Sequence, residues 1–500
     1  MKALFFPQYV CTPHFETELE LMADHLDKGD EVYVVYCKGE MPTCLNNIEH
    51  DVELCFKCKF YQSRGLKVLG IPKKNIINLP KKQPSYKPIT KRFQHSKELK
   101  EFKIDGVDIG AAAASTLFFT HDKEYKLDTI SFAYDVYREL KMGWYIYTFF
   151  LDLAKSMKPD VVYIFNGRFT GARMMWRVCE KLHIDFFTHE RGGLQKQYLL
   201  RKNAIPHDLD VTRQEILDLW NNAKNDREEV ARRFFIDRRK GMAQGFHSFT
   251  KDQAIGSLPK NFDSMKINIA IFNSTLEENA SVPGWENPIY EDDLEATRKL
   301  LEYFKDNDAY HLYLRVHPNL KGSKNSQIKE IEKYKKEFSN LTVIPPESRI
   351  HSYTLLDNCP KIVVFGSTIG VEACYWGKPA ILLARATYES LDCCYKPTTH
   401  EEAMALITSD LTPKSVAEAL KYGYWSVSFG VPFTNFQQTG VIQGTFYGKA
   451  ICKMPALVFF SFYMMKLLNS KNIKIAKKSL REMLGWIIPK LPFLKRLIKL

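Results

Sequence analysis

Short apolar runs alternate with helical segments along most of this chain, and this alternation most constrains its fold. In the first half the runs KALFFPQY, EVYVVYC, PDVVYIFNG and IDFFTHE are separated by helical patterns such as FETELELMADHL and GARMMWRVCEKLH. A second series begins with INIAIFNST and continues through YHLYLRVHP, LTVIPP, KIVVFGS and AILLA. Such alternation is typical of parallel sheets covered by helices. The pattern predicts an α/β protein with two doubly wound, Rossmann-like domains that face a cleft.

The length of the chain fits this division. With 500 residues it exceeds one ordinary hydrophobic core. A polar helical zone from about residue 211 to residue 240 precedes the expected junction near residues 256–263. We therefore expect an N-terminal domain at 1–260, a C-terminal domain at 261–450 and a separate tail at 451–500.

The tail carries most of the net charge of +13. From Lys453 onward it holds eleven Lys and Arg residues against the single acid Glu482, so the preceding residues are nearly balanced, which argues against a nucleic-acid groove. Its apolar residues, in PALVFFSFYMM and GWIIPKLPFLKRLIKL, are interleaved with lysines. This composition predicts an amphipathic anchor on an anionic membrane surface. A helix packed back on the first domain is the alternative for the earlier part of the tail, and the apolar run 454–465 is too short to span a bilayer.

The cysteines are expected to be mostly reduced. The start MKALFFPQYV does not have the pattern of an export signal, which favours a cytoplasmic location for the 11 cysteines. Four of them, Cys37, Cys44, Cys55 and Cys58, form a C-x6-C-x10-C-x2-C pattern in the loop 37–58. Four thiols at such spacing can close a structural zinc site. Four packed thiols and a redox pair are the alternatives.

Three polar turns follow strands of the second series. Because the strands are expected to be parallel, the turns should meet at one edge of the sheet and offer hydroxyl, imidazole, guanidinium and backbone N–H donors to a nucleotide phosphate. An ordinary helix cap would use the Ser and Thr residues equally well. The candidate binding residues in the three turns are Asn273, Ser274, Arg315, His317, Pro318, Gly366, Ser367 and Thr368.

One helical turn beyond the third of these turns lies Glu372. Its carboxylate is placed to hold ribose hydroxyls, as acidic residues do in other doubly wound nucleotide sites. The alternative is a surface glutamate on the helix.

The motifs of the second domain also resemble a known family. FNST, LRVHPN, SYTLLDNC, VVFGSTIGVEACYWGKPAILL and YKPTTHEEAMALI, in this order, look like the C-terminal half of bacterial surface-carbohydrate and capsular polysaccharide glycosyltransferases of the GT-B type. The resemblance covers residues 267–407 well and the first half more loosely. It implies that His317-Pro318 and Ser367-Thr368 hold the phosphates of the donor nucleotide.

The resemblance also implies a general base in the first domain. Relatives carry an acidic motif that ends in glycine, and THERGG with Glu190 is the nearest match. Glu190 is followed by Arg191, which departs from the motif and is expected either to bind the acceptor or to pair with Glu190. His14 is a second candidate for the base, with a capping or packed histidine as the alternative.

These observations predict a metal-independent glycosyltransferase that moves a sugar from a nucleotide-sugar donor (CMP-, UDP- or GDP-linked) to a surface polysaccharide or lipid-linked glycan. Metal independence is expected because the sequence offers no Asp-x-Asp at a strand end, and the EDD of residues 291–293 looks like a helix start. The protein is expected to be peripheral on the cytoplasmic face of the inner membrane. The alternatives are a UDP-sugar 2-epimerase, a polyol-phosphate transferase that uses a CDP carrier, and a non-catalytic polysaccharide assembly partner.

Overall fold

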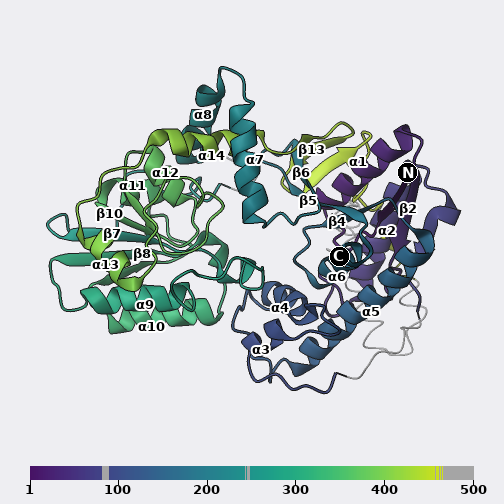
Figure 1. Ribbon diagram of the computed structural model, residues 1–500, viewed down its shortest axis with the longest axis horizontal. Helices are drawn as coiled ribbons and strands as arrows, with labels where there is room; N and C mark the ends of the chain where they lie inside the picture. The colour runs from purple at the N-terminus through teal and green to yellow at the C-terminus, as the bar shows by residue number, and fades with distance from the viewer. Residues whose placement is uncertain are drawn as a thin grey trace, which may run out of the picture.

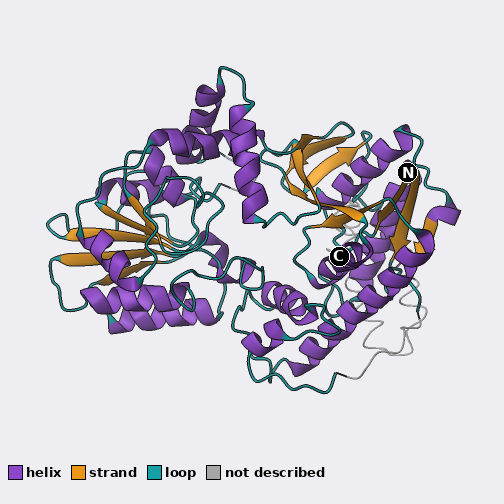
Figure 2. Cartoon of the chain, in the orientation of Figure 1, coloured by secondary structure: helices purple, strands orange, loops and turns teal. Residues whose placement is uncertain are grey.

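The computed structural model of the chain describes residues 1–81, 89–242, 244, 248–455, 458–460, 462 and 464. Figure 1 shows two lobes, and Figure 2 shows that each lobe has its own group of strands with helices around it. The predicted α/β fold with two doubly wound domains is confirmed.

The first domain is built on a seven-stranded sheet with the order β12-β6-β5-β4-β1-β2-β3. The five strands β3, β2, β1, β4 and β5 are parallel, and β6 and β12 complete the edge in antiparallel pairing. Ala3, Leu4 and Phe5 are fully buried, because helices cover both faces of the sheet. The strands are β1 (Lys2–Phe5), β2 (Glu31–Tyr36), β3 (Ile76–Asn78), β4 (Val161–Phe165), β5 (Asp185–Arg191), β6 (Gln197–Lys202) and β12 (Val431–Pro432).

Six helices and a short 3-10 turn surround this sheet. Asp51 caps the helix after the cysteine-bearing loop by accepting the N–H groups of Glu53 and Leu54. The helices are α1 (His14–Asp27), α2 (Val52–Val68), η1 (Lys73–Asn75), α3 (Ser96–Glu101), α4 (Ile109–Thr120), α5 (Ala133–Met157) and α6 (Thr170–Leu182).

The second domain contains a five-stranded, fully parallel sheet with the order β11-β10-β7-β8-β9. Its strands are β7 (Ile267–Phe272), β8 (Tyr310–Arg315), β9 (Leu341–Ile344), β10 (Lys361–Val364) and β11 (Ala380–Leu382). The helical turns η2 (Leu276–Glu278) and η3 (Pro318–Leu320) follow two of them, and the helices are α9 (Asp293–Phe304), α10 (Ser326–Glu337), α11 (Ser352–Asn358), α12 (Ile369–Tyr375) and α13 (His400–Thr408). Asp292 accepts the N–H groups of Leu294 and Glu295, so the EDD segment is a helix start, as predicted.

Three helices connect the lobes. They are α7 (Leu209–Asn221), α8 (Arg227–Arg239) and α14 (Val416–Ser428), which lie together at the top of Figure 1. After α14 the chain returns to the first domain, where β12 pairs with β6 and the hairpin β13 (Phe436–Gly440) and β14 (Gln443–Phe446) packs beside α1. Of the range expected for the second domain, 261–450, Val431 and Pro432 pair with the first sheet, and the hairpin that follows forms a separate two-stranded sheet beside it.

The described residues of the tail pack against α2. The Phe462 ring stacks on Phe56 with 4.3 Å between centroids, and Arg64 donates a hydrogen bond to the carbonyl of Lys453. The early part of the tail thus follows the alternative of a segment packed on the first domain, whereas residues 465–500 lie outside the described residues. Within the described chain, the helices are too short or too polar to cross a bilayer.

Candidate active site

The three predicted turns lie next to one another at the carboxyl edge of the second sheet. Strand β7 lies between β10 and β8, so the loops that follow these parallel strands open side by side. A cavity of about 290 Å³ is formed there. Seven predicted donor-site residues line it: Asn273, Arg315, His317, Pro318, Ser367, Thr368 and Glu372.

The two remaining predicted residues, Ser274 and Gly366, lie beside each other. A side chain at Gly366, which has φ of +71°, would meet the carbonyl of Arg385 at 3.0 Å and the Ser274 hydroxyl at 3.6 Å. Glycine is therefore required by both the backbone conformation and the space. The Ser274 carbonyl accepts a hydrogen bond from Gln327. These two residues shape the turn that carries Ser367.

Two buried donors of the cavity have no hydrogen-bond partner in the described chain. Asn273 is 5% exposed; its Oδ1 accepts the backbone N–H of His317 at 2.8 Å, and its Nδ2 is unpaired. Arg315 is 3% exposed and donates to the carbonyls of Pro345 and Ser348 at 2.9 and 3.2 Å, while its Nε is unpaired. Buried donors are rarely left unpaired, and both atoms belong to residues that line the cavity, so both are candidate contacts for a polar ligand.

The charge of the cavity is positive at Arg315 and neutral at His317. Burial lowers the pKa of Arg315 to about 10, which leaves the guanidinium charged at neutral pH. Burial also lowers the pKa of His317, and its Nδ1 accepts the N–H of Asn319 at 3.2 Å. The neutral ring therefore carries its proton on Nε2 and can donate one hydrogen bond. Such a donor set suits an anionic oxygen.

The turn before α12 uses part of its own hydrogen-bonding capacity. The Ser367 hydroxyl accepts the N–H of Ile369 at 3.3 Å, whereas Thr368, the N-cap residue of α12, makes no side-chain cap hydrogen bond. The Thr368 hydroxyl accepts a hydrogen bond from Arg238 at 3.0 Å. Both hydroxyls can still donate, and both residues line the cavity.

Glu372 is fully buried rather than placed on the surface. Arg238 donates to one carboxylate oxygen at 3.2 Å, and Tyr353 donates to the other. Burial lowers the pKa of Arg238, but Glu372 raises it above its ordinary value, so the guanidinium is charged. Because both oxygens are engaged, the predicted contact with ribose hydroxyls requires one of them to change partner.

Arg238 is the residue that reasoning from sequence missed. It lies in the last turn of α8, where REEVARRFFIDRR offers five arginines with nothing to distinguish one of them. Phe249, also outside the predicted set, lies 5.2 Å from the His317 ring and lines the same cavity. Neither residue belongs to a strand-end motif, so no local signal marks them.

The first domain places Glu190 at the end of β5. Its oxygens accept hydrogen bonds from Asn166 at 2.8 Å and from the backbone N–H of Arg191 at 3.0 Å. Burial raises its pKa, but His14 and these hydrogen bonds outweigh burial, and the net pKa is lowered. Glu190 is therefore an ionised carboxylate with fixed orientation.

His14 lies close to this carboxylate, with 3.6 Å between its Nδ1 and Glu190 Oε1. Burial lowers the pKa of His14 to about 4, so the ring is neutral. The guanidinium of Arg191 points elsewhere and donates to the carbonyl of Val441 at 2.8 Å. No ion pair joins Arg191 and Glu190 among the described residues, and binding of the acceptor by Arg191 stays a prediction.

The two predicted sites are linked through η2. The Glu278 carbonyl accepts a hydrogen bond from Arg168 at 3.1 Å, and its carboxylate accepts one from Asn319 at 3.4 Å. Arg168 lies two residues after Asn166, and Asn319 two residues after His317. Gly193, three residues after Glu190, lines the donor cavity. These contacts join the loop after β4, which holds Asn166, to the loop after β8, which holds His317.

The four predicted metal ligands Cys37, Cys44, Cys55 and Cys58 line another cavity, in the first domain. Over the described ranges, no three ligating side chains lie close enough together to hold one ion. The structure thus gathers the four thiols without placing them as ligands.

Comparison with known proteins supports the predicted resemblance of the second domain to capsule polysaccharide biosynthesis proteins. Residues 250–405 match the family model of capsule polysaccharide biosynthesis proteins. Comparison with curated protein sequences gave no match.

Similar solved structures include two Thermosulfurimonas dismutans KpsC transferases and a Listeria monocytogenes protein. The KpsC beta Kdo 2,4 transferase is 13% identical with a TM-score of 0.37, covering 53% of this chain and 79% of its own. The KpsC beta Kdo 2,7 transferase is 16% identical with a TM-score of 0.34, covering 55% and 79%. The Listeria putative UDP-N-acetylglucosamine 2-epimerase is 9% identical with a TM-score of 0.26, covering 84% and 93%. At these scores they add no argument about function. The resemblance to capsule polysaccharide biosynthesis proteins is confirmed by the family match, which spans the domain that holds the donor turns.

Proposed function

We propose that this protein is a glycosyltransferase of capsule polysaccharide biosynthesis that transfers a sugar from a nucleotide-sugar to a glycan acceptor. The observation that carries the proposal is the pair of buried, unpaired donors, Asn273 Nδ2 and Arg315 Nε, in one cavity at the carboxyl edge of a parallel sheet. This is where doubly wound domains bind nucleotides. The match of residues 250–405 to the capsule family supports the same assignment.

In the proposed reaction the donor cavity stabilises the departing phosphate. Arg315 supplies a positive charge, and Asn273 and the Nε2–H of His317 supply neutral hydrogen bonds. Donors fixed before the reaction stabilise the charge that develops on the leaving group without reorganising. A catalytic metal ion is not needed in this scheme.

The first domain supplies the base. Glu190 is ionised and is held by Asn166 and the N–H of Arg191 in an orientation that leaves it beside His14. It takes the proton of the acceptor hydroxyl as the new glycosidic bond forms. Neutral His14 does not compete for the proton at neutral pH, because its own pKa is about 4.

The acceptor is proposed to be a surface polysaccharide or a lipid-linked glycan. The basic tail would hold the protein on the cytoplasmic face of the inner membrane, through residues beyond those that pack against α2.

Calorimetric titration with CMP, CDP, UDP, GDP and ADP tests the donor site. We expect one nucleotide to bind, with affinity lowered about tenfold or more in Asn273→Ala and in His317→Ala, since each variant removes a hydrogen bond to an anion. Arg298→Ala is the control, because Arg298 pairs with Glu337 on the outer surface of the second domain.

The absence of binding by all five nucleotides would refute the proposed donor site. If a UDP-sugar is converted to an isomer without any acceptor, the protein is an epimerase and the transfer step is refuted. If a CDP-linked polyol is the substrate, the product carries the phosphate, which distinguishes phosphotransfer from glycosyl transfer.

A further inference from the structure

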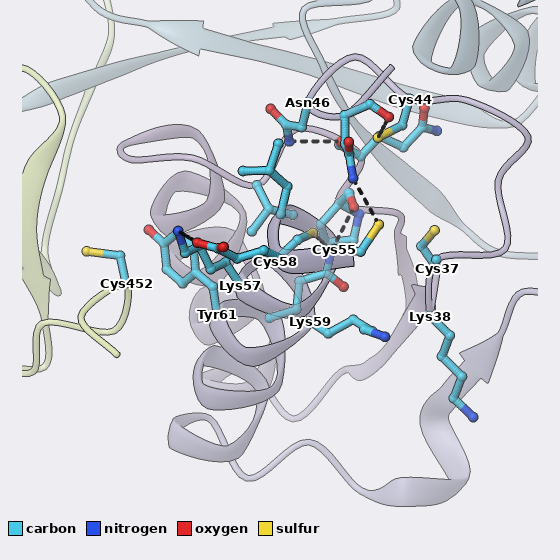
Figure 3. A pocket seen from close by; sticks show the side chains of 18 of the residues that line it. Cys37, Lys38, Cys44, Asn46, Cys55, Lys57, Cys58, Lys59, Tyr61 and Cys452 are labelled. Atoms are coloured by element: carbon cyan, nitrogen blue, oxygen red, sulfur yellow. Dashed lines mark hydrogen bonds and ion pairs between the residues drawn. The ribbon is translucent and has the colours of Figure 1, made fainter. Parts of the chain in front are cut away.

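The cavity that the four cysteines line is larger than the donor cavity and is shown in Figure 3. Its volume is about 670 Å³, which is that of a small-molecule site. One wall is the carboxyl edge of the first sheet, where Pro7 and Gln8 follow β1 and Cys37 follows β2. A second wall is α2. The third wall is the start of the tail, through Cys452, Lys453, Met454 and Phe459.

The walls of this cavity are uncharged and largely apolar. Burial raises the pKa of Cys37 and raises that of Cys44 and Cys58 to about 12, so these three thiols are neutral at pH 7. A neutral thiol packs as a small apolar group. The buried amides of Asn47 and Gln62 already donate to backbone carbonyls. Further apolar residues of the walls are Pro7, Val10, Met41, Leu54, Met454 and Phe459.

The charged residues of the cavity are mainly lysines. Four lysines line it against one carboxylate, that of Glu53, which Lys57 pairs with at 2.5 Å. In the part of the chain that the structure describes, Lys38, Lys59 and Lys453 have no carboxylate at ion-pair distance. They come from the loop after β2, from α2 and from the tail, so each wall contributes one unpaired cation. Ammonium groups of this kind are common ligands of phosphate.

Apolar side chains are exposed beside the cavity. Val52 and Leu54, in the first turn of α2, are 63% and 46% exposed, and Phe460 of the tail is 37% exposed. Large apolar side chains among lysines are typical of surfaces that enter the headgroup region of a membrane. The sequence beyond this point, residues 466–500, is itself rich in lysines and apolar residues.

We propose that this cavity binds one molecule of an anionic lipid, with a hydrocarbon chain between the apolar walls and the phosphate at Lys38, Lys59 and Lys453. A free phosphate would use the lysines but leave the apolar walls in contact with water. Glu190 ends β5 at the same edge of the parallel strands, so the lipid lies at the sheet edge that carries the proposed base. The lipid site goes beyond the transfer reaction and does not rest on it, and its test measures binding only.

Calorimetric titration of the full-length protein uses dihexanoyl phosphatidic acid below its micelle concentration, so that the protein meets single lipid molecules and no bilayer. We expect this probe to bind. Dihexanoyl phosphatidylcholine, which has the same chains but no net charge, should bind about fivefold or more weakly. Glycerol 3-phosphate, which lacks the chains, should bind about tenfold or more weakly. Equal affinity for glycerol 3-phosphate would make the cavity a site for free phosphate and overturn the lipid proposal.

Single variants test the lysines. Lys59→Ala and Lys453→Ala should each lower the affinity for dihexanoyl phosphatidic acid about fivefold. Lys67→Ala is the matched control, because Lys67 is exposed in the last turn of α2 and lies outside the cavity lining. An equal loss in Lys67→Ala would show that general charge attraction holds the lipid, and would overturn the site.

Thiol labelling locates the ligand without any variant. Dihexanoyl phosphatidic acid in the cavity should slow the reaction of Cys37, Cys44, Cys55 and Cys58 with a thiol reagent. Cys11 is also half-buried but does not line the cavity, so its rate should be unchanged. Unchanged rates at all four cysteines in the presence of bound lipid would exclude the cavity as the site. The absence of calorimetric binding would overturn the proposal outright.

Discussion

Arg238→Ala tests whether the contact between α8 and the donor domain stabilises the fold. Arg238 donates to the buried carboxylate of Glu372 and to Thr368, and removal of one partner from a buried ion pair costs about 3–5 kcal/mol. The Arg238 side chain is 34% exposed and Tyr353 still donates to Glu372, so we expect a smaller cost of about 2–3 kcal/mol. For a domain of this size, that lowers the melting temperature by about 4–12 °C.

Differential scanning calorimetry measures the effect against a control on the same helix. Arg233 pairs with Glu229, and both side chains are more than 60% exposed, so Arg233→Ala should cost about 0.5 kcal/mol or less. Adding Glu372→Gln to Arg238→Ala should recover part of the loss, because it removes the unpaired buried charge. Equal melting temperatures for Arg238→Ala and Arg233→Ala would refute this reasoning.

Four further predictions follow from the remaining contacts. Glu190→Gln should lower the rate of transfer about 100-fold or more while nucleotide affinity is unchanged; full activity would exclude Glu190 as the base. The unfolded chain protonates His14 near 6.5 but the folded protein only near 4, so stability should fall by about 2 kcal/mol between pH 7 and pH 5. In His14→Gln the pH dependence of the melting temperature should be flatter, and an unchanged slope would contradict the assignment. Glu20 accepts the backbone N–H groups of residues 434–436, so Glu20→Ala should cost about 2 kcal/mol and expose the hairpin to protease, whereas an undigested hairpin would show that the carboxylate is dispensable. Deletion of residues 466–500 should abolish binding to anionic vesicles, and retained binding would place the membrane contact elsewhere.

The sequence was sufficient for the fold class and for much of the donor cavity. Apolar runs and helical periodicity reflect neighbours along the chain, and they predicted two parallel sheets. Because the ends of parallel strands meet at one edge, the sequence predicts that the residues after β7, β8 and β10 lie close together. Seven of those residues line one cavity.

The same reasoning did not find partners that only packing brings together. Arg238 and Glu372 are 134 residues apart, and the Arg191 side chain contacts Val441, 250 residues away. Nothing local in either segment specifies the other.

By itself, then, the sequence determined the alternation of strands and helices, the positions of the polar turns and the clustering of four cysteines within a short segment. The tertiary structure alone decided that residues 431–446 return to the first domain. It also decided that Glu372 accepts a hydrogen bond from Arg238 and that Glu190 accepts one from Asn166. The physical reason is that periodicity and turn chemistry act over a few residues. Burial and ion pairing depend instead on which distant surfaces the fold brings into contact.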